Sequence, residues 1–159
     1  LFAAPRLTPD GGLTDTRLAL AGVANFIRVY RQQESAIERE YQDSFTVMSK
    51  QHEWSNRAVR RWYSRGMQKE PAALAALSAR MLVTLDTLLG VLDDEAGAYR
   101  LGDGTIAFED IEASRRYSEL RREITRMIDS ARAAGGEETG GPVAQLLQVV
   151  GTTRLPREI

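Results

Sequence analysis

His52 is the only histidine in the chain, and the chain contains no cysteine. A Ser-His-Asp triad needs a histidine beside a serine and an acid, and a di-iron bundle needs Glu-x-x-His on two helices. Neither pattern occurs, and without cysteine there is no thiolate chemistry and no cysteine-ligated metal. His52 follows Met48 by four residues, on or beside an apolar helix face, which is typical of a core or boundary residue. We therefore predict no catalytic residue, no cofactor and no metal site, and a non-enzymatic protein is favoured.

Carboxylates gather along one predicted helix, at Glu34, Glu38, Glu40 and Asp43. Arg39 lies among them and no histidine does, so this cluster has the composition of a solvated helix face. A second group of acids, at residues 93–95 and 103, lacks the twelve-residue ligand spacing of an EF-hand. There is also no glycine-rich phosphate loop after a predicted strand. These patterns predict neither a paired-carboxylate centre nor a cation site.

Basic residues are concentrated in residues 50–69, which carry six of them and one acid, whereas residues 93–110 carry six acids and one arginine. Cations near helix C-termini and anions near N-termini are favourable, and this accounts for much of the pattern. The remaining hypothesis is contact with an acidic partner. The residues that would make it are Arg57, Arg60, Arg61 and Arg65. Nucleic acid is not expected as a partner, because a wider basic face or a recognisable module would be needed.

The composition is that of one globular domain, with 159 residues, 43% of them hydrophobic, and a net charge of −1. Apolar residues recur at steps of three and four over most of the chain, which predicts an all-α fold. We find no internal repeat of useful period. The expected architecture is an elongated up-down helical bundle. Its predicted helices cover residues 14–65, 71–96, 108–133 and, as a short last helix, 143–151.

The predicted domain organisation has four parts. An irregular N-terminal arm covers residues 1–13, the helical bundle 14–134, a flexible glycine-rich linker 135–142, and a short C-terminal helix with its tail 143–159. Between the second and third helices, residues 98–108 contain Asp103-Gly104, which is a turn signal for a small β-hairpin. The alternative is an irregular loop in which Gly97 ends one helix and Thr105 caps the next. Of the two, the loop is slightly favoured.

A continuous first helix over residues 14–65 would be about 78 Å long, about twice the length of the helices that fold back on it. Its N-terminal half would lack a cover from the same chain. The apolar residues left bare would be Leu18, Val23, Phe26, Ile27 and Tyr30. Alternatively the helix breaks near Ser35, where a capping-box spacing occurs, and a four-helix bundle closes. No helix breaker lies there, so the continuous helix is the expected arrangement.

We therefore predict a helical protein-interaction domain, such as a scaffold, adaptor or sensor module. It would self-associate through residues 18–30 as a coiled-coil homodimer, or pair there with another helical protein. The alternative from another class is a small-molecule-sensing helical bundle whose ligand lies near Arg80, Arg121 or His52. A third is a cofactor-free all-α enzyme that would use arginines and a carboxylate.

Two features bear on origin and compartment. The first residues, LFAAPRLTPDGG, fit the remainder of a removed signal peptide or an upstream membrane helix, and they fit an arbitrary boundary equally well. A periplasmic or membrane-tethered protein is slightly favoured over a cytoplasmic one. The 19 arginines against two lysines suggest a GC-rich bacterial genome. No run of 18 apolar residues occurs, so no transmembrane segment is predicted.

Overall fold

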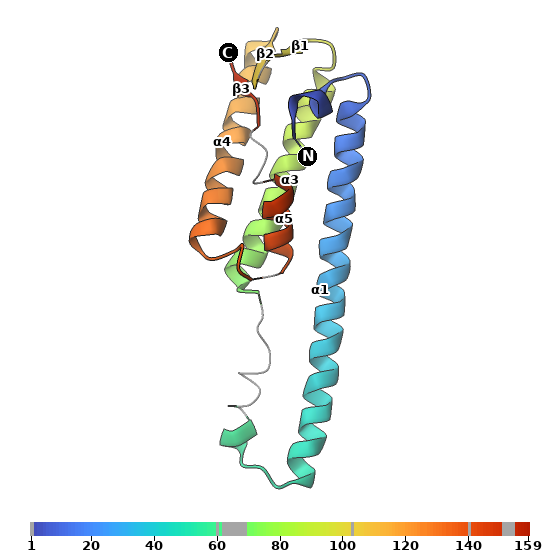
Figure 1. Cartoon of the computed structure of the whole chain (residues 1–159), viewed down its shortest axis with the longest axis vertical. Coiled ribbons are helices and arrows are strands. Elements are labelled where there is room, and N and C mark those ends of the chain that lie inside the picture. Colours follow the sequence, from blue (N-terminus) through green and yellow to red (C-terminus); the bar gives the residue numbers. More distant parts are fainter. Residues whose placement is uncertain (1, 60, 62–69, 103, 140, 151–154) are drawn as a thin grey trace. The chain divides into compact units, whose positions relative to one another are not determined.

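The computed structural model describes residues 2–59, 61, 70–102, 104–139, 141–150 and 155–159 (Figure 1). Its chain divides into two compact units. One unit joins Leu1–Ala24 to Pro71–Ile159, and the other is Asn25–Glu70. The long helix α1 (Gly12–Gln51) contributes residues to both units. The fold is mostly α-helical with one small sheet, which confirms the predicted class and the long first helix.

Helix α1 is continuous through Ser35, so the alternative with a break at that residue is wrong. Between Gly22 and the end of the helix there is no proline or glycine to interrupt the backbone hydrogen bonds. The helix ends at Gln51, well before the predicted boundary near residue 65. Glu53 adopts a left-handed conformation with φ of 51° just beyond that end. Residues 56–59 and 61 are helical again.

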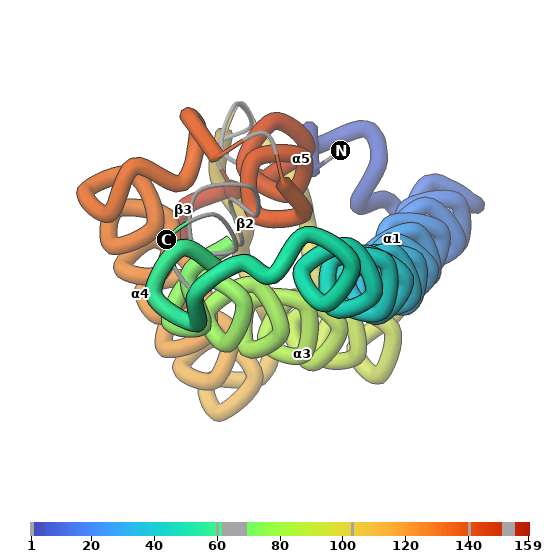
Figure 2. Tube along the Cα trace, turned by 90° about the horizontal axis from the view of Figure 1, so that it is seen from below, coloured from blue at the N-terminus to red at the C-terminus, as the bar shows by residue number. Residues whose placement is uncertain are grey.

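Three helices form most of the first unit. Helix α3 (Ala72–Asp94) packs against both α4 (Ile111–Ala133) and α5 (Pro142–Val150), as Figures 1 and 2 show. The buried face of α3 repeats at steps of three and four. Its largest members are Leu74, Met81, Leu85, Leu88, Leu89 and Leu92. Burial of these side chains is the main stabilising contribution of α3, because each removes a large apolar area from water.

Helix α3 is also long and apolar enough, by length and composition alone, to cross a membrane. The core helix of a folded domain has the same composition, and α3 has the burial pattern of a core helix. The finding is therefore weak evidence for a membrane span.

The sheet consists of β1 (Tyr99–Leu101), β2 (Thr105–Phe108) and β3 (Arg157–Glu158), in that order. β1 and β2 pair antiparallel with Tyr99 opposite Phe108, and β3 joins β2 in parallel. The hairpin prediction is thus confirmed, and the preference for an irregular loop is wrong. Asp110, and not Thr105, caps α4, because its carboxylate accepts from the backbone N–H groups of Glu112 and Ala113.

A cluster of three aromatic rings ties the sheet to the chain segments around it. Phe108 lies between Tyr99 and Tyr117, with ring centroids 5.8 and 5.4 Å away. The Tyr99 hydroxyl donates to the carbonyl of Leu7 in η1 (Ala4–Leu7), and that of Tyr117 to the carbonyl of Pro156 at 3.1 Å. Burial raises the pKa of Tyr99 to about 12, and burial also raises the pKa of Tyr117. Both hydroxyls therefore remain protonated donors.

Candidate functional site

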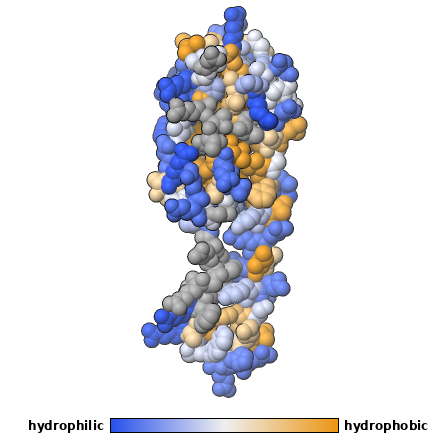
Figure 3. Space-filling view, in the orientation of Figure 1, coloured by the Kyte–Doolittle hydropathy of each residue, from blue (hydrophilic) through white to orange (hydrophobic). Residues whose placement is uncertain are grey.

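Most of the exposed large apolar side chains lie on α1. They are Leu18, Phe26, Tyr30, Ile37, Val47 and Met48. In the rest of the described chain, the residues of this kind are Trp54, Val83, Ile111 and Ile159, which are scattered over separate segments. Figure 3 shows apolar residues scattered among polar ones on one face of the molecule. Isolated exposed apolar residues are normal, whereas a group on one helix marks a candidate contact surface.

Four of these residues form one line along α1, which we call the apolar row: Phe26, Tyr30, Ile37 and Met48. At about 100° per residue they lie within about 40° of one another around the helix. Their exposed fractions are 51%, 36%, 62% and 46%. The rings of Phe26 and Tyr30 are in contact, with centroids 6.3 Å apart. The row extends for about 33 Å and lies entirely in the second unit.

The residues of the row are regularly spaced in the sequence, and this spacing, which we did not recognise as a repeat, could have indicated the row. Phe26, Ile37 and Met48 are separated by eleven residues each, and so are the cations Arg28, Arg39 and Lys50. Eleven residues make slightly more than three complete turns, so positions with this spacing form lines nearly parallel to the helix axis. One such line on α1 is apolar and the other is basic.

The charged residues nearest to the apolar row are both acids. Glu34 and Glu40 lie about 60° to either side of its centre, whereas Arg28, Arg39 and Lys50 lie about 140° or more away. Glu40 is exposed and Glu34 half-buried, and neither forms an ion pair or hydrogen bond with the residues that the structure describes. The row therefore has an acidic border, and the cations occupy the far side of the helix.

The predicted stripe at residues 18–30 is only partly the surface that the structure exposes. Phe26 and Tyr30 belong to the apolar row, and Leu18 is 68% exposed but lies about 100° around the helix from it. Val23 is half-buried, and Ile27 is only 3% exposed. Ile27 is therefore a core residue. The apolar surface extends beyond the predicted stripe to Ile37 and Met48.

The predicted basic contact at residues 57–65 is described only in part. Arg57 and Arg61 are exposed, and Arg60 and Arg65 lie outside the described residues.

His52 is exposed and does not belong to the core. Its ring lies 6.0 Å from that of Trp54, which packs against Phe45, and Phe45 stacks on Tyr41 at 5.8 Å. This aromatic cluster covers the C-terminal turn of α1. His52 has no carboxylate partner there within the described chain, so it lacks the arrangement of a general base.

A groove of about 430 Å³ lies between α3 and α4, lined by Arg80, Arg122, Arg126 and Met127 among others. Arg80 pairs with Glu123 at 2.9 Å. Arg126 forms no ion pair or hydrogen bond within the described part of the chain. The groove could hold a small anion at Arg126, and Arg80, which was proposed for ligand binding, also lines it.

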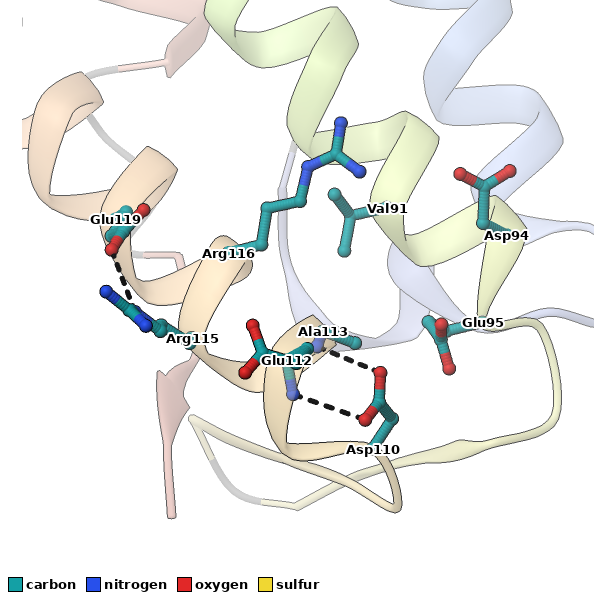
Figure 4. Close-up of a pocket in the computed structure, with 9 residues that line it drawn as sticks. All are labelled: Val91, Asp94, Glu95, Asp110, Glu112, Ala113, Arg115, Arg116 and Glu119. Atoms are coloured by element: carbon teal, nitrogen blue, oxygen red, sulfur yellow. Dashed lines mark hydrogen bonds and ion pairs between the residues drawn. The ribbon is translucent and has the colours of Figure 1, made fainter.

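A second pocket of about 370 Å³ lies where α3 ends and α4 begins (Figure 4). Its lining is mostly acidic, with Asp94, Glu95, Asp110, Glu112 and Glu119. Asp110 caps α4 and Glu119 pairs with Arg115 at 3.3 Å, so both have structural roles. Across the described ranges no group of histidine, cysteine, aspartate and glutamate side chains is suited to a metal ion.

Arg121 holds the C-terminal strand instead of lining a ligand site. Its guanidinium donates to the carboxylate of Glu158 in β3 at 3.0 and 3.4 Å. Burial pushes the pKa of Glu158 upward, but hydrogen bonds from Ser118 and Arg121 outweigh it and lower that pKa to about 2. The pair is ionised at any ordinary pH and fixes β3 against α4.

Comparison of the chain with protein-family models, with curated proteins and with solved structures finds no match.

Proposed function

We propose that the protein is a non-enzymatic helical interaction domain whose contact surface is the apolar row on α1. It would act by covering this row with a second helix, contributed by another copy of the chain or by another helical protein. The observation that carries the proposal is the exposure of Phe26, Tyr30, Ile37 and Met48 in one line on one helix.

The size of the row sets the strength of contact to expect. A strip about 33 Å long and roughly 10 Å wide gives on the order of 330 Å² per partner, well below the roughly 800 Å² of a stable interface. We therefore expect association in the micromolar range, with rapid exchange of partners, and not a permanent complex.

Sedimentation of the native chain over a wide concentration range tests self-association. The double variant Phe26→Ser/Ile37→Ser removes half of the row without adding charge. The matched control is Val83→Ser/Ile111→Ser, which removes two exposed apolar residues from α3 and α4. A dimer that is lost only in the row variant supports the row as a self-interface. A monomer at every concentration excludes self-association and leaves another helical protein as the partner.

The alternative function is a small-molecule sensor that binds an anion in the groove between α3 and α4. It is supported by Arg126, whose guanidinium lines the groove without a described partner. Millimolar dicarboxylates or phosphates should then raise the unfolding temperature by several degrees. The Arg126→Gln variant should show no such increase. Unfolding temperatures unchanged by these anions would remove this alternative.

A cofactor-free enzyme has the least support. This hypothesis named no particular arginine, and the two arginines proposed for the sensor, Arg80 and Arg121, are paired with Glu123 and Glu158. Neither pair leaves a free carboxylate beside a free guanidinium at which a substrate could be bound and deprotonated.

A further inference from the structure

We propose that the helix which covers the apolar row is an amphipathic helix with basic borders, from a protein other than this chain. The inference rests on the proposed function and adds the chemistry of the partner. Its basis is the position of charge around α1, where Glu34 and Glu40 border the row on both sides.

Both border carboxylates are available to a partner. Glu40 is exposed, Glu34 is half-buried, and neither has an ion pair or hydrogen bond in the described chain. A covering helix places its own border residues next to these two acids. Lysine or arginine at those positions would form ion pairs on each side of the apolar contact, as the border charges of paired helices do.

A second copy of the chain fits this border less well. If two copies of α1 pack with their apolar rows in contact, the charged residues nearest to the contact are Glu34 and Glu40 of both copies. This holds whether the two helices are parallel or antiparallel. The cations Arg28, Arg39 and Lys50 lie on the opposite side of α1 and would face away from the contact. Each like-charge pair weakens such a contact by about twofold at low salt, which matters for an interface this small.

The eleven-residue spacing adds a geometric requirement for the partner. Because Phe26, Ile37 and Met48 lie on a line nearly parallel to the axis of α1, a covering helix matches the row best when its apolar residues also repeat every eleven positions. A heptad helix would drift away from the row, since its apolar line winds around the helix in the other direction.

The test uses two synthetic helical peptides with identical apolar residues at eleven-residue spacing. One carries lysine at the border positions and the other glutamate. Binding of each labelled peptide to the full chain is measured by fluorescence anisotropy at 0.05 M and 0.3 M salt. We expect the lysine peptide to bind at least tenfold more tightly at low salt, and the preference to shrink at high salt.

Two single variants locate the charge effect. Glu40→Lys and Asp43→Lys change the charge of α1 by the same amount, but Glu40 borders the row and Asp43 lies about 120° from its centre. Glu40→Lys should weaken binding of the lysine peptide about fivefold, and Asp43→Lys less than twofold. Phe26→Ser/Ile37→Ser should weaken binding of both peptides, which ties the binding to the row.

The outcomes separate this inference from the proposed function. If both peptides bind the row with equal affinity, the basic partner is wrong and the interaction domain stands. If the native chain forms a dimer through the row that excludes the lysine peptide, a second copy is the occupant and the inference is again wrong. If neither peptide binds and the chain is monomeric, the proposed function itself is overturned.

Discussion

The backbone N–H of Trp54 lies 3.0 Å from the carbonyl oxygen of Ser49, and that of Glu53 lies 3.4 Å from the carbonyl of Lys50. These two bonds form a Schellman motif, in which the residue at the Glu53 position has to adopt a left-handed conformation. Glycine usually occupies that position, because a Cβ atom makes the conformation strained. Glu53 has φ of 51° there. The end of α1 is therefore stabilised by its hydrogen bonds and by the packing of Trp54 on Phe45, against the backbone preference of Glu53.

Glu53→Gly should stabilise the chain by about 1 kcal/mol, because glycine adopts the left-handed conformation without strain. Urea unfolding followed by circular dichroism measures the change. Glu53→Ala is the control, since alanine retains a Cβ atom and should give no gain. A loss of stability in Glu53→Gly would show that the glutamate side chain, and not the backbone, determines this turn.

Tyr117→Phe should destabilise the fold by about 1 kcal/mol. The variant removes the hydroxyl that donates to Pro156 at 3.1 Å, and it leaves a buried carbonyl without that partner. Tyr30→Phe removes a hydroxyl from an exposed ring and should change the unfolding midpoint little. Equal effects of the two variants would contradict the role of Tyr117 in fixing the C-terminal strand.

The ion pair between Arg121 and Glu158 predicts a dependence of stability on pH. The pKa of Glu158 is about 2 in the folded chain, below its ordinary value of 4.5. Because the folded state favours the ionised carboxylate, the contribution is fully present above about pH 4.5 and is lost as the pH falls toward 2. In Glu158→Gln the unfolding temperature should be lower at pH 7 and should fall less between pH 4.5 and pH 2.

The control for this pH profile is Glu109→Gln, which removes an exposed carboxylate that forms no ion pair in the described part of the chain. It should keep the native pH profile. A Glu158→Gln profile parallel to the native one over the whole range would show that the pair adds no acid-dependent stability.

Substitution of alanine for Gly136 and for Gly90 should change the stability of the fold in opposite directions. A Cβ atom on Gly136 would lie 2.7 Å from the carbonyl oxygen of Ala131, which belongs to the backbone and cannot move aside easily. Gly136→Ala should therefore destabilise the fold by about 2 kcal/mol. A Cβ atom on Gly90, inside α3, would meet nothing within 4 Å. Gly90→Ala should stabilise the chain by up to about 1 kcal/mol, because alanine is the better helix former.

The helices were predictable from the sequence because their signals are local. Leu74, Met81, Leu85, Leu88 and Leu92 recur at helical spacing, and this repeat alone indicates the buried face of α3. The continuity of α1 was predictable too, since the sequence around Ser35 contains no residue that interrupts a helix. In both cases the pattern and the structure depend on residues within a few turns of one another.

Features that depend on distant residues were not predictable. The end of α1 at Gln51 is set by a left-handed glutamate and by ring packing, and neither glycine nor proline marks it. Strand β3 has two residues and exists only because Thr105 and Ile106 pair with them. Likewise, periodicity placed both Phe26 and Ile27 on an apolar stripe, but only the folded chain separates the exposed ring from the buried side chain.

Helix α3 is the most apolar of the long helices, and both helices that pack on it come later in the chain. During synthesis at about 5–20 residues per second, its leucine-rich face is complete several seconds before Val150 has been added. For that interval the nascent chain presents a segment with the length and hydropathy of a membrane span before α4 and α5 have been made to cover it. A chain truncated before α4 should therefore aggregate, because the apolar face of α3 would lack the two helices that cover most of it.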